Sequence, residues 1–384
     1  MIVRYERWGA WVKLESMPAV VALDRAGVSA LGLDPVWDDV APPVRPIEVH
    51  VAVTGQCGAG CEGCYLDARP DGAHVPREEL QRTFASLERA GVFTVAFGGG
   101  EPTLRDDLGE VAEDARARSL TPVLTTSGIG LTAARVERLR AFAQVNVSYD
   151  GPSEAYEAVR GFDGAAAAER SLGLLRDAGI RVGVNVVVTR DTFDALETIL
   201  ERAKALGAVE AQLLRYKPAG RAARLDYLAK RLSREQVLRL PGVLRKLSEK
   251  YAGEFRLRID CAMVPFLSSD EEICADPSRL ERFGVLGCVA GDTLAAVEKG
   301  GFLSPCSFLP KSAQRGDTVD EGLHDPAFEP LRRYAESPAA PCDACPLRRS
   351  CRGGCKVVST YLDGRIGPDP ECPRVLAHRE WLPA

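Results

Sequence analysis

Three closely spaced cysteines, Cys57, Cys61 and Cys64, are the residues of this sequence best suited to metal chemistry. They are separated by three and then two residues, unlike the paired Cys-x2-Cys of zinc ribbons or a four-ligand ferredoxin run. Three thiolates can hold three corners of a cubane cluster and leave the fourth iron without a protein ligand. We therefore expect an iron–sulfur site with one open iron, at which a ligand that is not protein can bind.

A second stretch with chemical potential is Gly98-Gly99-Gly100-Glu101, which follows a short apolar run. Glycines let another group approach the backbone without interference from a Cβ atom, and Glu101 can face a cationic amine. A glycine run after a strand is by itself also typical of a tight turn. Its position one strand and one helix after the open-iron loop favours a ligand site.

Nine further cysteines follow, of which Cys261 and Cys274 come first. The other seven are Cys288, Cys306, Cys342, Cys345, Cys351, Cys355 and Cys372. A zinc site could use the four cysteines between Cys342 and Cys355, but it would leave the remaining three of this set unexplained.

An alternation of strands and amphipathic helices runs from residue 46 to about residue 216 and must position the first two motifs. Strands are expected at Ile47–Val53, Thr94–Phe97, Thr121–Thr126, Gln144–Tyr149, Arg181–Val188 and Glu210–Tyr216. The repeat predicts an α/β fold, a partial (β/α)6 TIM-like barrel with parallel strands and right-handed crossovers. Ligands bind at the carboxyl ends of such strands, and the three-cysteine loop and the glycine run both fall there.

Composition excludes several classes of protein. The chain of 384 residues is 46% hydrophobic, which is ample for a large core, and its net charge of −5 argues against a nucleic-acid partner. Its charged start differs from a signal peptide, and no run of about 18 apolar residues could span a membrane. We expect a cytoplasmic protein, in which cysteines bind metal rather than form disulfides.

The segment Cys57-x3-Cys61-x2-Cys64, followed by Gly99-Gly100-Glu101, resembles the radical S-adenosylmethionine (SAM) family. The resemblance implies that the three cysteines hold a [4Fe–4S] cluster whose open iron binds the amine and carboxylate of SAM, while Gly99, Gly100 and Glu101 meet the amine. One electron then breaks the sulfonium, and the 5′-deoxyadenosyl radical abstracts a hydrogen atom from the substrate. Further SAM contacts implied by the resemblance are Ser127, Ser148, Arg160 and Asn185.

One position departs from that family. The residue before the third cysteine is usually aromatic there, whereas this chain has Gly63, with Tyr65 following the cysteine. The departure concerns the contact between this loop and the adenine of SAM.

The seven late cysteines resemble the SPASM domain of the same family, which implies two auxiliary [4Fe–4S] clusters. By position, one cluster would use Cys342, Cys345, Cys351 and Cys372. The other would use Cys288, Cys306 and Cys355, and we expect Cys261 rather than Cys274 as its fourth ligand, because a strand end is a rigid platform. The cysteine left over is either inert or a catalytic hydrogen-atom donor.

Four segments follow from these patterns. Residues 1–45 contain a short hairpin or lid and form an N-terminal cap or a partner-docking segment. Residues 46–232 form the barrel, and residues 233–286 form a linking helix and strand, in which Ser233 and Gln236 make a capping box and Pro241 kinks or breaks the helix. Residues 287–384 form the SPASM domain.

We expect an enzyme that cleaves SAM and modifies a peptide, as ribosomal-peptide maturases of the resembled family do. One alternative is oxidation or rearrangement of a small molecule or sugar, and another is an iron–sulfur electron carrier without enzymatic activity. The expected partners are the substrate and a reductant such as flavodoxin or ferredoxin, with neither nucleic acid nor membrane. The auxiliary clusters would assist oxidation or anchor the substrate.

Overall fold

The structure is a computed structural model that describes residues 1–14, 20–39, 46–224, 227–309, 319–322 and 326–381. A nine-stranded sheet runs through it in the order β10-β9-β8-β7-β6-β5-β4-β11-β12. Neighbouring strands are parallel throughout except for the last pair, β11 and β12. The strands are β4 (Glu48–Thr54), β5 (Thr94–Gly99), β6 (Thr121–Thr126), β7 (Gln144–Ser148), β8 (Val182–Val188), β9 (Glu210–Arg215), β10 (Arg256–Ile259), β11 (Leu294–Val297) and β12 (Leu303–Ser304).

Strands β4 to β9 confirm the predicted six-unit repeat, but the sheet is longer than a (β/α)6 barrel at both ends. The expected linking strand is β10, which pairs with β9 and extends the sheet. Strands β11 and β12 lie within the predicted SPASM segment, and β11 pairs with β4 on the other side. Strands of four and two residues hold too few side chains for an alternating pattern to stand out. Sequence patterns therefore missed β11 and β12.

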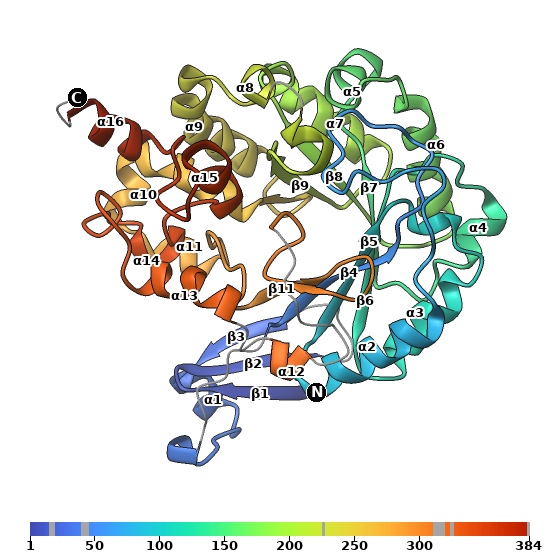
Figure 1. Ribbon diagram of the computed structural model, residues 1–384, viewed down its shortest axis with the longest axis horizontal. Helices are drawn as coiled ribbons and strands as arrows, with labels where there is room; N and C mark the ends of the chain where they lie inside the picture. The colour runs from blue at the N-terminus through green and yellow to red at the C-terminus, as the bar shows by residue number, and fades with distance from the viewer. Residues whose placement is uncertain (15–19, 40–45, 225–226, 310–318, 323–325, 382–384) are drawn as a thin grey trace.

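Helices connect the parallel strands and cover the outside of the sheet (Figure 1). They are α2 (Arg77–Arg89), α3 (Leu108–Arg116), α4 (Ala133–Glu137), α5 (Ser153–Arg160), α6 (Ala165–Asp177) and α7 (Leu196–Ala205). Their apolar faces pack on one face of the strands, as for Phe84 of α2, whose ring stacks on Phe97 of β5 at 5.6 Å between centroids.

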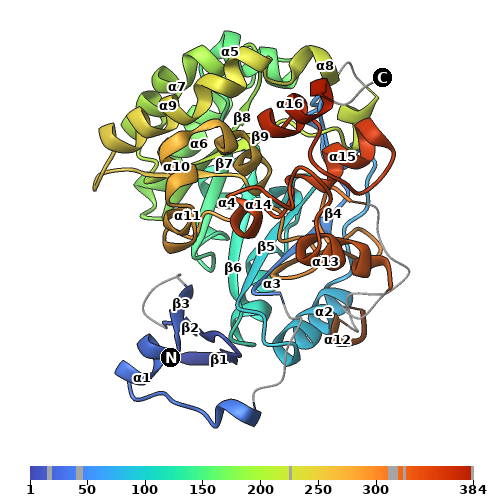
Figure 2. The ribbon, with the colours of Figure 1, turned by 90° about the vertical axis from the view of Figure 1, so that its left-hand side faces the viewer.

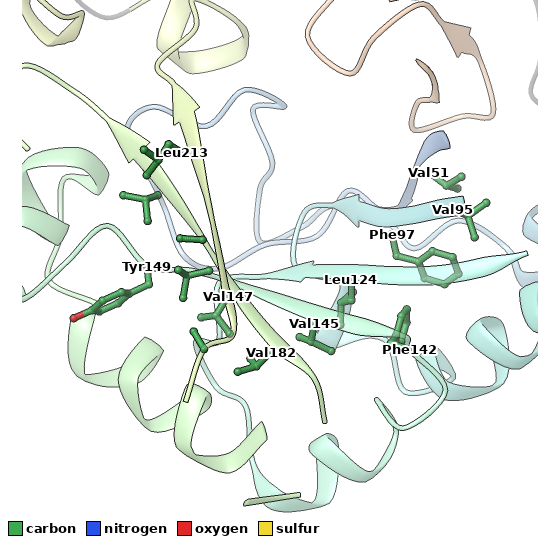
Figure 3. Close-up of a cluster of buried hydrophobic side chains, with 14 of the residues drawn as sticks. Val51, Val95, Phe97, Leu124, Phe142, Val145, Val147, Tyr149, Val182 and Leu213 are labelled. Carbon is green, nitrogen blue, oxygen red and sulfur yellow. The ribbon is translucent and has the colours of Figure 1, made fainter. Parts of the chain in front are cut away.

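The buried core therefore lies between sheet and helices (Figure 3). Because strand side chains alternate between faces, Val145 and Val147 of β7 enter this core, whereas Asn146 and Ser148 lie on the opposite face. Ser148 is in register with Asn185 of β8. The inner face is thus the polar one, and its carboxyl end is where a ligand can meet polar side chains.

A separate antiparallel sheet consists of β1 (Ile2–Glu6), β2 (Gly9–Lys13) and β3 (Val20–Asp24), and α1 (Arg25–Ala30) follows it. Arg4 donates hydrogen bonds to the carbonyls of Pro46 and Gly91, and Lys13 donates one to the carbonyl of Ser119. Gly91 and Ser119 precede β5 and β6, so this sheet lies at the amino ends of the barrel strands (Figures 1 and 2). The prediction of a hairpin is confirmed, and that of a lid is wrong, because the ligand end is opposite.

After the barrel, α9 (Arg234–Lys250) begins at the predicted capping box of Ser233 and Gln236. The helix continues through Pro241 instead of breaking there. The chain then returns through β10, β11 and β12 to the short helices α14 (Arg348–Cys351), α15 (Lys356–Asp363) and α16 (Pro373–Trp381). Within the described residues, no helix combines the length and apolar character needed to cross a bilayer.

Candidate active site and cysteine groups

The three-cysteine loop follows β4 and is held in place by Arg221. The guanidinium of Arg221 donates to the carbonyl of Cys61 at 3.0 and 2.8 Å and to the carbonyl of Ala68 at 2.8 Å. Its backbone N–H also donates to the carbonyl of Cys64. Arg221 lies in the segment after β9, whose sequence has no helix or strand periodicity. Hydrogen bonds from that segment therefore hold the three-cysteine loop in place.

The thiols of this loop share one electrostatic environment with Glu101. Burial raises the pKa of the Cys57 thiol, and the nearby charges of Glu101, Cys61 and Cys64 raise it further. Among the described residues, no three His, Cys, Asp or Glu side chains converge closely enough to bind a single metal ion. A cubane cluster binds its cysteines at separate iron corners, so its ligands need not meet at one point.

Gly99 and Gly100 bring the cysteine loop to the end of β5. An added Cβ atom would lie 2.3 Å from the carbonyl oxygen of Thr54 at Gly99 and 2.1 Å from that of Gln56 at Gly100. The N–H groups of Gly100 and Glu101 donate to these same carbonyls at 2.8 and 2.7 Å. The chain's own backbone, which leads into Cys57, therefore comes close to both glycines, and the predicted ligand contact there stays a prediction.

The carboxylate of Glu101 is buried and already used within the protein. One oxygen accepts from the hydroxyls of Thr103 and Thr126 at 2.7 and 2.6 Å, and the other accepts from the N–H and hydroxyl of Ser127 at 2.7 and 2.6 Å. The structure thus brings together two predicted site residues, Glu101 and Ser127. An amine bound here would share the carboxylate with these donors.

Arg160 is the last residue of α5, and Asn185 lies in the middle of β8. The Nε atom of Arg160 donates to the fully buried Asp150 at 2.5 Å, and its carbonyl accepts from the N–H of Glu62 in the cysteine loop. The Oδ1 atom of Asn185 is buried and has no hydrogen-bond partner among the described residues. Buried polar atoms are normally satisfied, so this acceptor and the Arg160 guanidinium fit a polar ligand inside the barrel mouth.

Four of the later cysteines form a first group: Cys261, Cys288, Cys306 and Cys355. Burial raises the pKa of Cys306 to about 12 and that of Cys355 to about 11, and the charges of the other thiols contribute in the same direction. The pKa of Cys261 is raised by burial, then by Asp260, Cys288 and Cys355. The raised pKa values keep the thiols of Cys261, Cys306 and Cys355 protonated at neutral pH until a metal replaces the proton.

A second group of four cysteines lines one small cavity. Its sulfur-bearing residues are Cys342, Cys345, Cys351 and Cys372. The set coincides with the ligands that the SPASM resemblance implies. It excludes Cys355, which interacts with the first group, and so disfavours a zinc site within residues 342–355.

Cys274 lies beside the second group rather than in the first. Its thiol donates to the carbonyl of Ser268 at 3.4 Å, lies 3.5 Å from a guanidinium nitrogen of Arg374, and interacts electrostatically with Cys345. The preference for Cys261 as the fourth member of the first group therefore agrees with the arrangement.

A buried ion pair adjoins the first group. Lys217 donates to Asp260 at 2.5 Å and its ammonium lies 4.0 Å from the centre of the Phe308 ring. Burial lowers the pKa of Lys217, but Asp260 and the thiols of Cys261 and Cys355 more than offset this and raise it. Sequence patterns missed Lys217 because it lies in a loop; the carboxylate directly before Cys261 was the available signal.

An open cleft of about 600 Å³ lies between the three-cysteine loop and the first group. Tyr65, next to Cys64, packs on Phe308, two residues from Cys306, with 4.5 Å between ring centroids. Leu66, Leu309, Tyr361 and Lys299 also line it. Both cysteine sites therefore adjoin the same largely apolar cleft.

A comparison with protein families matches residues 51–203 to the radical SAM superfamily. The chain contains a radical SAM domain. That domain implies one [4Fe–4S] cluster and SAM as its cofactors. Two polar groups at its mouth fit such a ligand: the Oδ1 atom of Asn185, which has no hydrogen-bond partner among the described residues, and the carboxylate of Glu101, which Ser127 already shares.

Relatives extend the similarity over most of the chain. The AdoMet-dependent heme synthase of Nitratidesulfovibrio vulgaris is 26% identical over 83% of this chain and 90% of its own length. The mycofactocin maturase MftC of Mycobacterium ulcerans is 28% identical over 85% of this chain and 88% of its own length. Both are named as enzymes, which supports an enzyme over an electron carrier.

Among solved structures, Streptococcus suis SuiB bound to the precursor peptide SuiA is similar to this chain. The TM-score is 0.74 at 16% identity, over 97% of this chain and 98% of SuiB. At this identity the likeness establishes the α/β fold alone.

Proposed function

We propose that this radical SAM enzyme modifies a peptide. One observation carries the proposal: the three-cysteine loop and the first four-cysteine group adjoin one open cleft of about 600 Å³, large enough for several side chains of an extended peptide. Relatives named mycofactocin maturase and PqqA peptide cyclase support a peptide substrate. The apolar walls at Tyr65, Leu66 and Phe308 suit an apolar or aromatic residue of that peptide.

Within this proposal, Cys57, Cys61 and Cys64 hold the SAM-binding [4Fe–4S] cluster. Bound there, SAM supplies a 5′-deoxyadenosyl radical that abstracts a hydrogen atom from the substrate. Glu101 and the backbone at Gly99 and Gly100 bind the amine end. The remaining proposed SAM contacts are Ser127, Ser148, Arg160 and Asn185.

We propose that the two later groups hold auxiliary [4Fe–4S] clusters. Cys261, Cys288, Cys306 and Cys355 would hold the cluster beside the cleft, which places it next to the substrate. Cys342, Cys345, Cys351 and Cys372 would hold the other. Cys274 as a hydrogen-atom donor remains a prediction.

The choice between Cys261 and Cys274 is testable by iron content. Replacing Cys261 with alanine removes a ligand from the first group, so we expect the loss of up to about four irons per chain. The matched variant Cys274→Ala should retain the wild-type iron content and spectrum after anaerobic reconstitution. The assignment is wrong if the two results are reversed.

The function itself is tested with dithionite and SAM. Anaerobically reconstituted protein should release 5′-deoxyadenosine, measured by liquid chromatography, and the release should depend on both reagents. Absence of the product from protein with a full iron content would disprove radical SAM chemistry in this chain.

The alternative of a small-molecule substrate draws support from the relative named heme synthase. Coexpression with each short open reading frame beside the gene, followed by mass spectrometry of the peptide, separates the two. A mass change that needs the three cysteines supports the maturase.

We further propose a flavodoxin or ferredoxin as reductant in a reducing cytoplasm, where the twelve free thiols of this chain persist.

A further inference from the structure

Lys356, the first residue of α15, is buried next to the cysteine groups. It follows Cys355 directly and is only 2% exposed. Lysine is almost never fully buried unless it is paired with an opposite charge. In the part of the chain that the structure describes, Lys356 forms no ion pair with a carboxylate. The negative partner that such a burial requires must therefore be of another kind.

Three neighbours surround the nitrogen of Lys356. It donates to the carbonyls of Gly353 and Gly367 at 3.1 Å each, and it lies 3.7 Å from the centre of the Tyr334 ring. An ammonium has three donors and no acceptor, and the face of an aromatic ring attracts a cation. These surroundings therefore suit the charged form of the side chain.

Gly353 makes room for this arrangement. An added Cβ atom at Gly353 would lie 2.3 Å from Cε1 of Tyr334 and 2.9 Å from Nζ of Lys356. The φ of Gly353 is +77°, which also favours glycine. The loop between Cys351 and Cys355 is thus shaped to hold the ring and the ammonium against each other.

Thiols of both groups of four cysteines act on this charge. Burial lowers the pKa of Lys356, whereas Cys288 of the first group and Cys351 and Cys342 of the second act to raise it, together with Asp369. Lys356 in turn opposes the rise in the pKa of Cys342 and Cys351 that burial causes. The ammonium therefore lies where it meets negative charge from both groups once their thiols are deprotonated.

We propose that Lys356 is a positioning residue whose buried positive charge raises the reduction potentials of both proposed auxiliary clusters. A [4Fe–4S] cluster with four thiolate ligands is negatively charged and becomes more so on reduction, so a nearby cation stabilises the reduced form. The inference rests on the proposed function. It favours a role of these clusters in oxidation over substrate anchoring, because a cluster with a higher potential takes up an electron more readily.

The test is a redox titration followed by electron paramagnetic resonance, in the variant that has alanine at positions 57, 61 and 64. This background removes the SAM-binding cluster, so the signals come from the auxiliary clusters alone. A unit charge about 10 Å away, at a dielectric constant of about 20, changes an equilibrium about tenfold. At a fixed ambient potential, Lys356→Met should lower the ratio of reduced to oxidised cluster by about tenfold for both clusters, which is about 59 mV for a one-electron couple.

Two matched variants separate charge from packing. Lys356→Arg keeps the positive charge, so it should keep both potentials close to those of the parent protein. Arg365→Met removes a positive charge from an exposed position just beyond the end of α15. It should change neither potential, because water and salt screen exposed charges.

Unchanged potentials in Lys356→Met at full iron content overturn the inference and leave the proposed function intact. A shift confined to one cluster overturns it too, because the charge would then not be shared. If Lys356→Met loses its iron, retention of iron by Lys356→Arg supports the need for the charge, whereas loss from both variants overturns it, since packing would then explain the effect. An iron content of about four per chain in the wild type would instead disprove the proposed auxiliary clusters themselves.

Discussion

Replacement of Cys57, Cys61 and Cys64 by alanine should abolish the release of 5′-deoxyadenosine and leave about eight of about twelve irons bound. The reason is the separation of the three cysteine sites. The first follows β4, whereas the other two are built from residues after β10 and approach one another through the C-terminal segments. Iron analysis and chromatography of the same preparation measure both effects.

Cys274→Ala is the matched control for this variant, because it removes a thiol outside all three proposed ligand sets. It should keep both the product and the iron. Loss of all iron from the triple variant would mean that the sites assemble together and are not independent. Remaining 5′-deoxyadenosine would mean that the radical does not arise at this loop.

Replacement of Arg215 by methionine should destabilise the fold by roughly 3–5 kcal/mol, the usual cost of leaving buried charges without their partner. Its guanidinium donates to both carboxylate oxygens of Asp369 at 2.6 and 3.1 Å and to Glu371 at 2.7 Å. All three side chains are buried. The variant leaves the buried Asp369 without its ion pair, whereas Glu371 keeps its pair with Arg231 at 2.7 Å.

Arg215→Met should also affect the two groups of four cysteines. Asp369 also accepts from the N–H of Cys355, and Cys372 follows directly after Glu371. Arg215 therefore joins β9 to the segment between the two groups of four cysteines. We expect reduced iron content together with the lower stability.

Denaturant unfolding followed by fluorescence, with iron counts, measures the effect of Arg215→Met. The control is Arg234→Met, whose partner Glu380 lies in an exposed pair. Exposed pairs contribute little, so this variant should unfold at nearly the wild-type midpoint. Equal midpoints for both variants would show that the buried network does not hold the two parts together.

Sequence patterns predicted the features that depend on residues close together in the sequence. Alternating apolar residues located β4 to β9. The grouping of the late cysteines came from the family resemblance, and Cys261 as a cluster ligand stays a prediction. The contacts that position these motifs join distant residues: Arg221 reaches Cys61 across 160 positions, and Arg215 reaches Asp369 across 154. No periodicity marks such side chains, because Arg221 lies in a short 3-10 turn and Arg215 is the last residue of its strand.

The glycines show a second limit. Backbone of residues 54–56 lies against Gly99 and Gly100, which the sequence did not show, and their contact with SAM stays a prediction. Gly63 was noted only as a departure from a family pattern. A sequence shows that a side chain is missing, whereas only the fold shows which atoms fill the space.

The pairing of β11 with β4 has a consequence for synthesis of the chain. Strand β4 ends at Thr54, but its neighbour spans Leu294–Val297 and leaves the ribosome some 240 residues later. Until then the edge of β4 that precedes the three-cysteine loop has open backbone donors and acceptors, the kind of edge that promotes aggregation. The barrel and the cysteine-rich end must therefore mature together, and a shortened chain that stops before β11 would expose this edge permanently.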